Sequence, residues 1–269
     1  MKFMRSTEVE LPANIVRGLP HREGSTDVKA GSELHPSTGQ PVGLPIDTRP
    51  AQRPGPVTLE GRHGRLEKLD LDRHSAQLWS ALEDYDWLWT YLAHGPFAHE
   101  NAFVDWLAKR AKLKDPYYYA IVDNAGRALG LIALGATRPD MRVVEVGRIV
   151  LAPALQRTTL GTEAQFLLAC YVFETLRFRR YEWRADVLNA ASCRAALRLG
   201  FTFEGIFHGD LIVKGRNADT AWFAMLETDW PARRAVFERW LAPENFDGEG
   251  QQKTSLAVTR ADWTVDTTV

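Results

Sequence analysis

The sequence predicts an α/β protein of the α+β kind, with a central mixed sheet and helices on both faces. Short segments rich in β-branched and aromatic residues come first and are joined by turns. From residue 143 onward, strand patterns alternate with helix patterns in the order β-α-β-α-β. The segment at 161–178 is nearly apolar all round, which is typical of a helix buried against a sheet.

The first 57 residues differ from the rest of the chain in composition. They hold eight of the fourteen prolines and six of the twenty glycines, and Phe3 is their only aromatic residue. Such a segment cannot pack a core of its own. We therefore expect an N-terminal arm over residues 1–57, with its first thirty or so residues disordered or extended, and a folded domain over residues 58–230.

The first half of this domain shows strand, helix and hairpin patterns in turn. Residues 57–69 predict two short strands, or one strand bent at Gly61 and Gly64. Three helices should follow, and a hairpin should then turn at 123–126. The expected bounds are 72–82, 86–92 and 100–112 for the helices, and 117–122 and 128–136 for the hairpin strands.

The second half contains the alternating unit. The expected strands are 143–151, 181–187, 202–208 and 221–228, the last two joined through 211–220, and the expected helices are 161–178 and 190–199. The stretch 231–269 should hold a last helix, started by Trp230-Pro231 and ended by Pro243, and then a polar tail. We expect this tail to be loose from residue 245, although Trp263 could anchor it.

Composition excludes several classes of protein. The formal net charge of −1 gives no overall attraction to nucleic acid or to an anionic membrane, so neither is an expected partner. Two cysteines without a CxxC or HExxH pattern indicate neither a disulfide framework nor a metal site. The longest apolar run, at 166–173, is too short to span a bilayer, and no secretory leader is evident, so we expect a cytoplasmic protein.

The segment 145–164 carries the strongest functional pattern. A predicted strand rich in β-branched residues is followed by a proline and a polar turn, and the apolar helix begins after the turn. The first N–H groups of a helix lack intrahelical partners and attract anions, so this turn is suited to a phosphate or pyrophosphate. An ordinary strand-to-helix turn is the alternative. The residues of the turn are Gln156, Arg157, Thr158, Thr159, Leu160, Gly161 and Thr162.

The turn lacks the GxxxxGK[ST] and GxGxxG patterns of the best-known phosphate loops. It resembles instead motif A of the GNAT acetyltransferase superfamily, [Q/R]xxGx[G/A], with Gln156 and Gly161 at the matching positions. About forty residues later, the NxxSxxxxxxxGF pattern of the RimJ/RimL-like branch follows. Its matching residues are Asn189, Ser192, Gly200 and Phe201. Segments 39–45, 59–69 and 215–225 are also similar to that branch.

This resemblance implies a GNAT-like fold, with a twisted, mostly antiparallel mixed sheet, and a strap over the domain from residue 39 onward. It implies acetyl-CoA as cosubstrate, with no metal, and an amine acceptor that is either a protein N-terminus or a small molecule. The turn would hold the pyrophosphate, and Asn189 and Ser192 would lie beside the cofactor. The backbone of Ile149, Val150 and Leu151 would pair with the pantetheine arm.

The resemblance also implies chemical roles. Glu145, in an otherwise apolar strand, would be the general base that deprotonates the amine. Gly147 could mark a bulge that separates this strand from the next. The tyrosine that many GNAT enzymes use as general acid is Ala196 here, so Ser192, or a water held by Asn189, would protonate the thiolate. Thr159 replaces the first glycine of the motif, and a β-branched residue does not easily take positive φ.

The acceptor pocket is expected where aromatic and charged residues could meet over the strand ends. The residues considered are Asp84, Trp87, Trp89, Tyr91, Arg216 and Asp219. Core packing is the alternative for the tryptophans. The rival function, for which Thr159 and Ala196 argue, is a non-catalytic module that binds coenzyme A or a protein partner. The sequence leaves a homodimer open.

Overall fold

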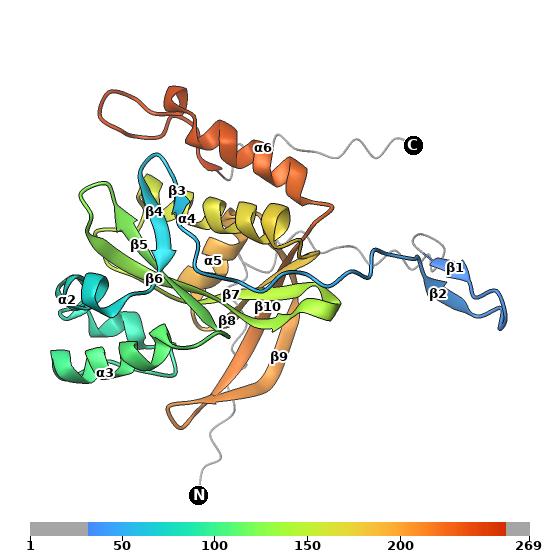
Figure 1. Ribbon diagram of the computed structural model, residues 1–269, viewed down its shortest axis with the longest axis horizontal. Coiled ribbons are helices and arrows are strands. Elements are labelled where there is room, and N and C mark those ends of the chain that lie inside the picture. Colours follow the sequence, from blue (N-terminus) through green and yellow to red (C-terminus); the bar gives the residue numbers. More distant parts are fainter. Residues whose placement is uncertain (1–31, 257–269) are drawn as a thin grey trace, which may run out of the picture.

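The computed structural model describes residues 32–256. An eight-stranded sheet in the order β3-β4-β5-β6-β7-β8-β10-β9 forms its centre (Figure 1). Neighbouring strands are antiparallel except β7 and β8, which are parallel, so the predicted mixed, mostly antiparallel sheet is confirmed. The strands are β3 (Leu59–Glu60), β4 (Gly64–Lys68), β5 (Tyr117–Asp123), β6 (Ala128–Arg138), β7 (Val143–Leu151), β8 (Arg180–Asp186), β9 (Thr202–Val213) and β10 (Arg216–Leu226).

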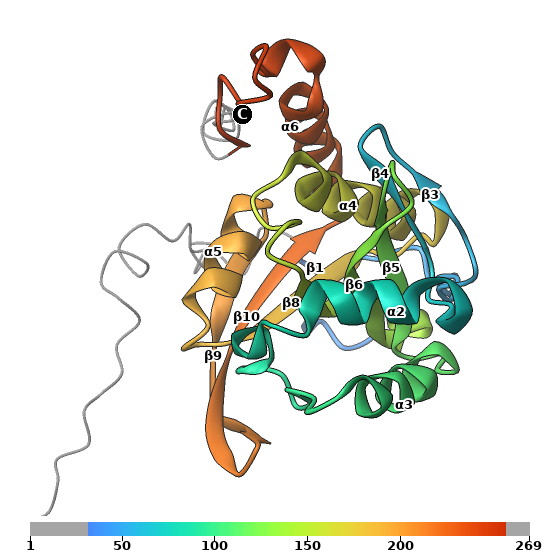
Figure 2. The ribbon, with the colours of Figure 1, turned by 90° about the vertical axis from the view of Figure 1, so that its left-hand side faces the viewer.

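Helices cover both faces of this sheet (Figure 2). Two of them, α2 (Leu71–Leu82) and α3 (Glu100–Ala111), pack on one face. The other face carries α4 (Thr159–Cys170), α5 (Ala190–Arg198) and α6 (Trp230–Leu241). The buried apolar residues accordingly form two clusters, one on each side of the sheet.

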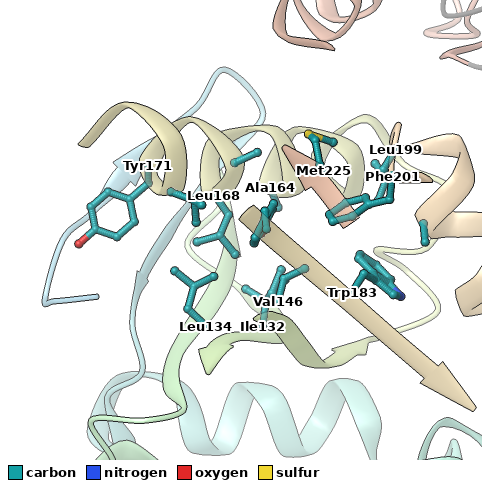
Figure 3. Packing of buried hydrophobic residues seen from close by; sticks show 14 of the residues in the cluster. Ile132, Leu134, Val146, Ala164, Leu168, Tyr171, Trp183, Leu199, Phe201 and Met225 are labelled. Atoms are coloured by element: carbon teal, nitrogen blue, oxygen red, sulfur yellow. The ribbon is translucent and has the colours of Figure 1, made fainter. Parts of the chain in front are cut away.

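The central strands are apolar at nearly every position because both of their faces are buried. In β6, Ile132 and Leu134 belong to the cluster under α4, whereas Leu131 and Ala133 belong to the cluster under α2 and α3. Figure 3 shows Ile132, Leu134 and Val146 packed below Ala164 and Leu168 of α4. This alternation tells which face each side chain of a strand points to.

Three elements differ from their predicted form. The helix expected at 161–178 begins at Thr159 and ends as an α-helix at Cys170, and a π-helical turn, η3 (Tyr171–Thr175), extends it. The helix expected at 86–92 is a single 3-10 turn, η1 (Asp86–Trp89). The predicted connection 211–220 is mostly strand, because β9 and β10 form one long hairpin that turns at Lys214 and Gly215.

The arm divides into two parts within the described residues. A hairpin of β1 (Ser32–Leu34) and β2 (Pro41–Gly43), which the sequence did not predict, extends away from the domain (Figure 1). Residues 44–57 then run across the domain as the expected strap, where Ala51 is buried and its N–H donates to the Pro139 carbonyl at 3.1 Å. The expectation for the first thirty residues lies outside the described part.

The C-terminal segment folds back on α6 as far as it is described. The indole Nε1 of Trp240 donates to Gln252 Oε1 at 2.8 Å, and Leu256 is buried. The prediction of a loose tail from residue 245 is therefore wrong for residues 245–256, and Trp263 lies outside the described residues. Within 32–256, no helix is long and apolar enough to cross a membrane.

Candidate active site

The parallel strands β7 and β8 separate in the middle of the sheet. They pair only over Val143–Val146 and Arg180–Trp183. The register between β6 and β7 shifts between Gly147 and Val150, and Arg148 in this bulge has a φ of +53°. The predicted separation is thus confirmed, but the left-handed residue that makes the bulge is Arg148 rather than Gly147.

A cleft of about 320 Å³ opens where the two strands separate. Residues 145–149 of β7, 183–186 of β8, and Asn189 and Ser192 at the start of α5 line it. Residues 91 and 92, after η1, and residues 211, 213, 218 and 220 of the β9–β10 hairpin complete the lining. A site of this size between strands can hold a small ligand or an extended arm.

The cleft connects the two faces of the sheet. Val144 and Val146 belong to the cluster under α4, so Glu145 between them points to the opposite face, which carries α2 and α3. By the same alternation, Trp183 points towards α5 and Arg184 points away from it. Two reactants could therefore enter from opposite faces and meet between β7 and β8.

Glu145 is buried and bound by two guanidinium groups. Its Oε1 accepts a hydrogen bond from Arg148 Nη1 at 3.0 Å, and its Oε2 accepts one from Arg184 Nη2. The Arg184 guanidinium also stacks on Trp222, 4.7 Å from the ring centre. The predicted base thus lies in the cleft wall, held by two arginines that the prediction did not include.

Ser192 and Asn189 come from the start of α5. Asn189 is the N-cap of this helix, and its Oδ1 accepts a hydrogen bond from the Ser192 N–H at 3.1 Å. Ser192 Oγ accepts a hydrogen bond from Trp183 Nε1 at 3.0 Å, which leaves its own O–H able to donate into the cleft. Ala196, at the position where the resemblance led us to look for a tyrosine, is fully buried.

The predicted phosphate turn precedes α4. Thr158 is the N-cap, and its Oγ1 accepts a hydrogen bond from the Gly161 N–H at 3.1 Å. Arg157, with a φ of +60°, is the left-handed residue of the turn, whereas Thr159 is the first residue of the helix. The objection that Thr159 cannot take positive φ therefore does not apply.

The backbone of this turn offers several donors. Within residues 32–256, the N–H groups of Arg157, Thr159 and Leu160 donate to no protein acceptor, as expected at a helix N-terminus. The Gln156 side chain ties the turn to the end of β7, since its Nε2 donates to the Leu151 carbonyl at 2.9 Å. A Cβ on Gly161 would lie 2.8 Å from the Leu155 carbonyl oxygen, so this position requires glycine for a close backbone approach.

Of the twelve predicted cofactor residues, Ile149, Asn189 and Ser192 line the cleft, whereas the whole turn at 156–162 and two residues of β7 lie outside its lining. Leu160 is buried in the core, and Thr162 Oγ1 accepts a hydrogen bond from Arg198 Nη1 at 3.1 Å. Ile149 lines the cleft, but Val150 and Leu151 pair with β6 beyond its lining. The Thr162 N–H donates to the Thr158 carbonyl at 3.4 Å, so of Leu160 and Thr162 only Leu160 offers a free backbone N–H to a ligand at the turn.

The predicted acceptor residues do not come together. Tyr91 lines the cleft, and its hydroxyl donates to the Leu188 carbonyl at 3.0 Å. Trp89 is buried against Phe97 and Trp106, so core packing explains it. Asp84, Trp87, Arg216 and Asp219 do not line the cleft.

Asp219 instead stabilises the β9–β10 hairpin. The Gly209 N–H donates to this carboxylate at 2.8 Å, and His208 and Asn217 also bind it. These hydrogen bonds lower the pKa of Asp219 to about 2. Lys214 at the hairpin turn donates to the Trp89 carbonyl at 2.7 Å, which ties the hairpin to the region of η1. Sequence reasoning missed the hairpin residues of the cleft because it placed a loop there.

Neither cysteine has the properties of a nucleophile. Burial raises the pKa of the Cys193 thiol to about 11 and that of Cys170 to about 12, so both are protonated at neutral pH. Across residues 32–256, no group of three histidine, cysteine or acidic side chains could hold a metal ion. The polar and charged side chains that line the cleft include those of Glu145, Arg148, Arg184 and Ser192.

Comparison with known proteins assigns the family. The profile of the acetyltransferase (GNAT) domain matches residues 65–202. A GCN5-related N-acetyltransferase of Brucella melitensis is 44% identical; the match covers 80% of this chain and 99% of that one, with a TM-score of 0.78. A GNAT-family acetyltransferase structure from Chromobacterium violaceum is 37% identical over 73% of this chain and 100% of its own, with a TM-score of 0.67.

A curated relative supports the branch that the sequence resembles. YdaF of Bacillus subtilis strain 168, named as a candidate ribosomal N-acetyltransferase, is 27% identical over 150 residues, which cover 54% of this chain and 80% of YdaF. The profile match, the two solved structures and the cleft between β7 and β8 all agree with an acyltransferase. The chain belongs to the GNAT acetyltransferase family.

Proposed function

We propose that this enzyme transfers an acetyl group from acetyl-CoA to a primary amine, with Glu145 as the general base. The observation that carries this proposal is the cleft through the sheet. Glu145 lies on the α2–α3 face, and Ser192 and the turn before α4 lie on the other. Such a site keeps the acceptor amine and the thioester apart until they meet between the strands.

The proposed place of coenzyme A is the α4 face of the sheet, from the turn at 156–162 to the cleft. The free N–H groups of Arg157, Thr159 and Leu160 support binding of its pyrophosphate, and the Arg157 side chain adds a positive charge. From there the pantetheine arm would follow the open edge of β7 near Ile149, where β8 no longer pairs. Asn189 and Ser192 would then lie beside the sulfur.

The reaction needs one proton removed and one returned. The neutral amine attacks the thioester carbonyl, the C–N bond forms, and the C–S bond breaks. Glu145 takes the proton from nitrogen, directly or through a water, because each of its oxygens keeps a lone pair beside its arginine. The Ser192 hydroxyl protonates the departing thiolate and regains a proton from solvent.

The acceptor is proposed to be the N-terminus of a polypeptide, with a small-molecule amine as the alternative. The name of YdaF favours the first. Thiol release from acetyl-CoA, measured over a panel of peptides and small amines, tests the activity. Turnover with at least one class is expected, and no turnover with any acceptor would overturn the proposal.

Calorimetry with acetyl-CoA complements this assay. We expect one binding site per chain, weakened by substitutions in the turn at 156–161. Absence of binding would refute the cofactor site, whereas binding without turnover would favour the non-catalytic module.

A further inference from the structure

The cleft contains more positive charge around Glu145 than this carboxylate balances. Arg148 and Arg184 both bind it, so the group of three keeps one net positive charge. Each guanidinium has five N–H donors, and each gives one hydrogen bond to Glu145. In the described part of the chain, neither arginine forms an ion pair with any other carboxylate.

Both arginines can reach a ligand. Their side chains are 37% and 29% exposed, and both residues line the cleft, whereas Glu145 between them is buried. The left-handed bulge directs Arg148, and stacking on Trp222 holds the Arg184 guanidinium in place. Two fixed guanidinium groups with free donors match the geometry of a carboxylate or phosphate.

The position of the pair assigns its ligand to the acceptor rather than to coenzyme A. Glu145 and Arg184 point to the α2–α3 face, and the turn that would bind pyrophosphate precedes α4 on the other face. Asp186, the second carboxylate of the cleft, is held by the Leu188 N–H at 2.8 Å. It makes no ion pair with the arginines among the described residues, so their free donors stay available.

We propose that Arg148 and Arg184 form a subsite for an anionic group next to the acceptor amine. This inference rests on the proposed function. An acceptor whose amine lies at Glu145 would place a carboxylate one residue away within the reach of both arginines, because each of them is itself hydrogen-bonded to Glu145. The class expected is a polypeptide with an acidic residue at its N-terminus or directly after it.

Matched acceptors test this subsite. Peptides that begin with Asp or Asn, or carry either as second residue, are identical in shape and differ only in charge. For the unmodified enzyme we expect kcat/KM to favour the Asp peptide roughly tenfold or more, mostly through KM, as for a charge-assisted hydrogen bond. In Arg184→Met and Arg148→Met this ratio should fall towards one, even if both rates drop.

Arg138→Met is the matched control. Arg138 binds the buried Glu182 in a similar way, at 2.9 Å, but does not line the cleft. In this variant the ratio of kcat/KM for the Asp peptide to kcat/KM for the Asn peptide should equal that of the unmodified enzyme. The KM for acetyl-CoA should not depend on which peptide is used. A merely structural role of Arg148 and Arg184 would change rates without changing the Asp-to-Asn ratio.

Binding measurements separate the subsite from the activity. Calorimetry of the CoA-loaded protein with the same peptides should show tighter binding of the Asp peptide, lost in Arg184→Met, whether or not acetylation occurs. If turnover is absent but this preference is present, the proposed function fails and the subsite stands. Equal binding and equal turnover of Asp and Asn peptides, or binding of neither, would overturn the subsite.

Discussion

At the residue scale, two buried glutamates in neighbouring strands differ in whether they line the cleft. Glu145 and Glu182 are opposite each other in the β7–β8 pair, and each binds two arginines. Only Glu145 lines the cleft. The sequence could predict Glu145, because a charge in an apolar strand is unusual. It could not predict Arg184 as a partner, since strand register joins residues 39 positions apart.

The neighbours Ser192 and Cys193 provide a residue-scale prediction. Ser192→Ala should lower kcat roughly tenfold, less than the about 10²-fold usual for a general acid, because a thiol of pKa about 8.5 is a fair leaving group. The KM for acetyl-CoA should change little. Cys193→Ala should keep its activity, since the thiol is buried and protonated. Steady-state kinetics of both variants check this, and inactivation by Cys193→Ala would contradict it.

At the scale of elements, the phosphate turn was predictable in place but not in conformation. The strand, the turn and the helix start fall where the pattern puts them, within two residues. The residue with positive φ is Arg157. The sequence does not indicate this conformation, because positive φ is expected mainly at glycine and asparagine. The outer part of the β9–β10 hairpin was missed for a related reason: Gly209 follows the predicted strand end at 208, yet it lies inside β9.

The close approach of the Gly161 backbone to the Leu155 carbonyl oxygen predicts the effect of a substitution. In Gly161→Ala, the new Cβ would meet the Leu155 carbonyl oxygen and push the turn outward, at a cost of about 1–3 kcal/mol in stability. The KM for acetyl-CoA should rise about tenfold, which equals about 1.4 kcal/mol of binding.

Gly43→Ala is the control for this substitution, because a Cβ added there would meet no atom within 4 Å and the φ of Gly43 is not positive. Its melting temperature and KM should match those of the unmodified enzyme. An unchanged KM in Gly161→Ala would mean that the turn does not hold the cofactor.

At the scale of the whole molecule, the fold class and both helix layers followed from periodicity, because long apolar patterns depend little on tertiary detail. The strap was expected from the resemblance alone, because composition marks residues 1–57 only as a separate arm. Residues 51–55 lie on the domain: the Gln52 N–H donates to the Leu176 carbonyl, and Tyr119 Oη donates to the Gly55 carbonyl at 3.0 Å. Proline-rich composition predicts the absence of a separate core, but not what the segment packs against.

Two truncations test the strap. Removal of residues 1–43 should leave the free energy of unfolding of the domain nearly unchanged, since among residues 32–256 the strands β1 and β2 pair only with each other. Removal of residues 1–57 should cost at least about 2 kcal/mol, because the buried Tyr119 hydroxyl and the Leu176 carbonyl lose their partners. Urea denaturation measures both, and equal stabilities would contradict a structural role for the strap.

The central claim is that Glu145 accepts the proton of the amine in the cleft between β7 and β8. It is tested most directly by kcat/KM for Glu145→Gln beside Glu182→Gln, a buried and doubly paired glutamate outside the cleft. We predict a loss of about 10²–10⁴-fold in Glu145→Gln and nearly full activity in Glu182→Gln. Full activity in Glu145→Gln, or an equal loss in both variants, would contradict the account.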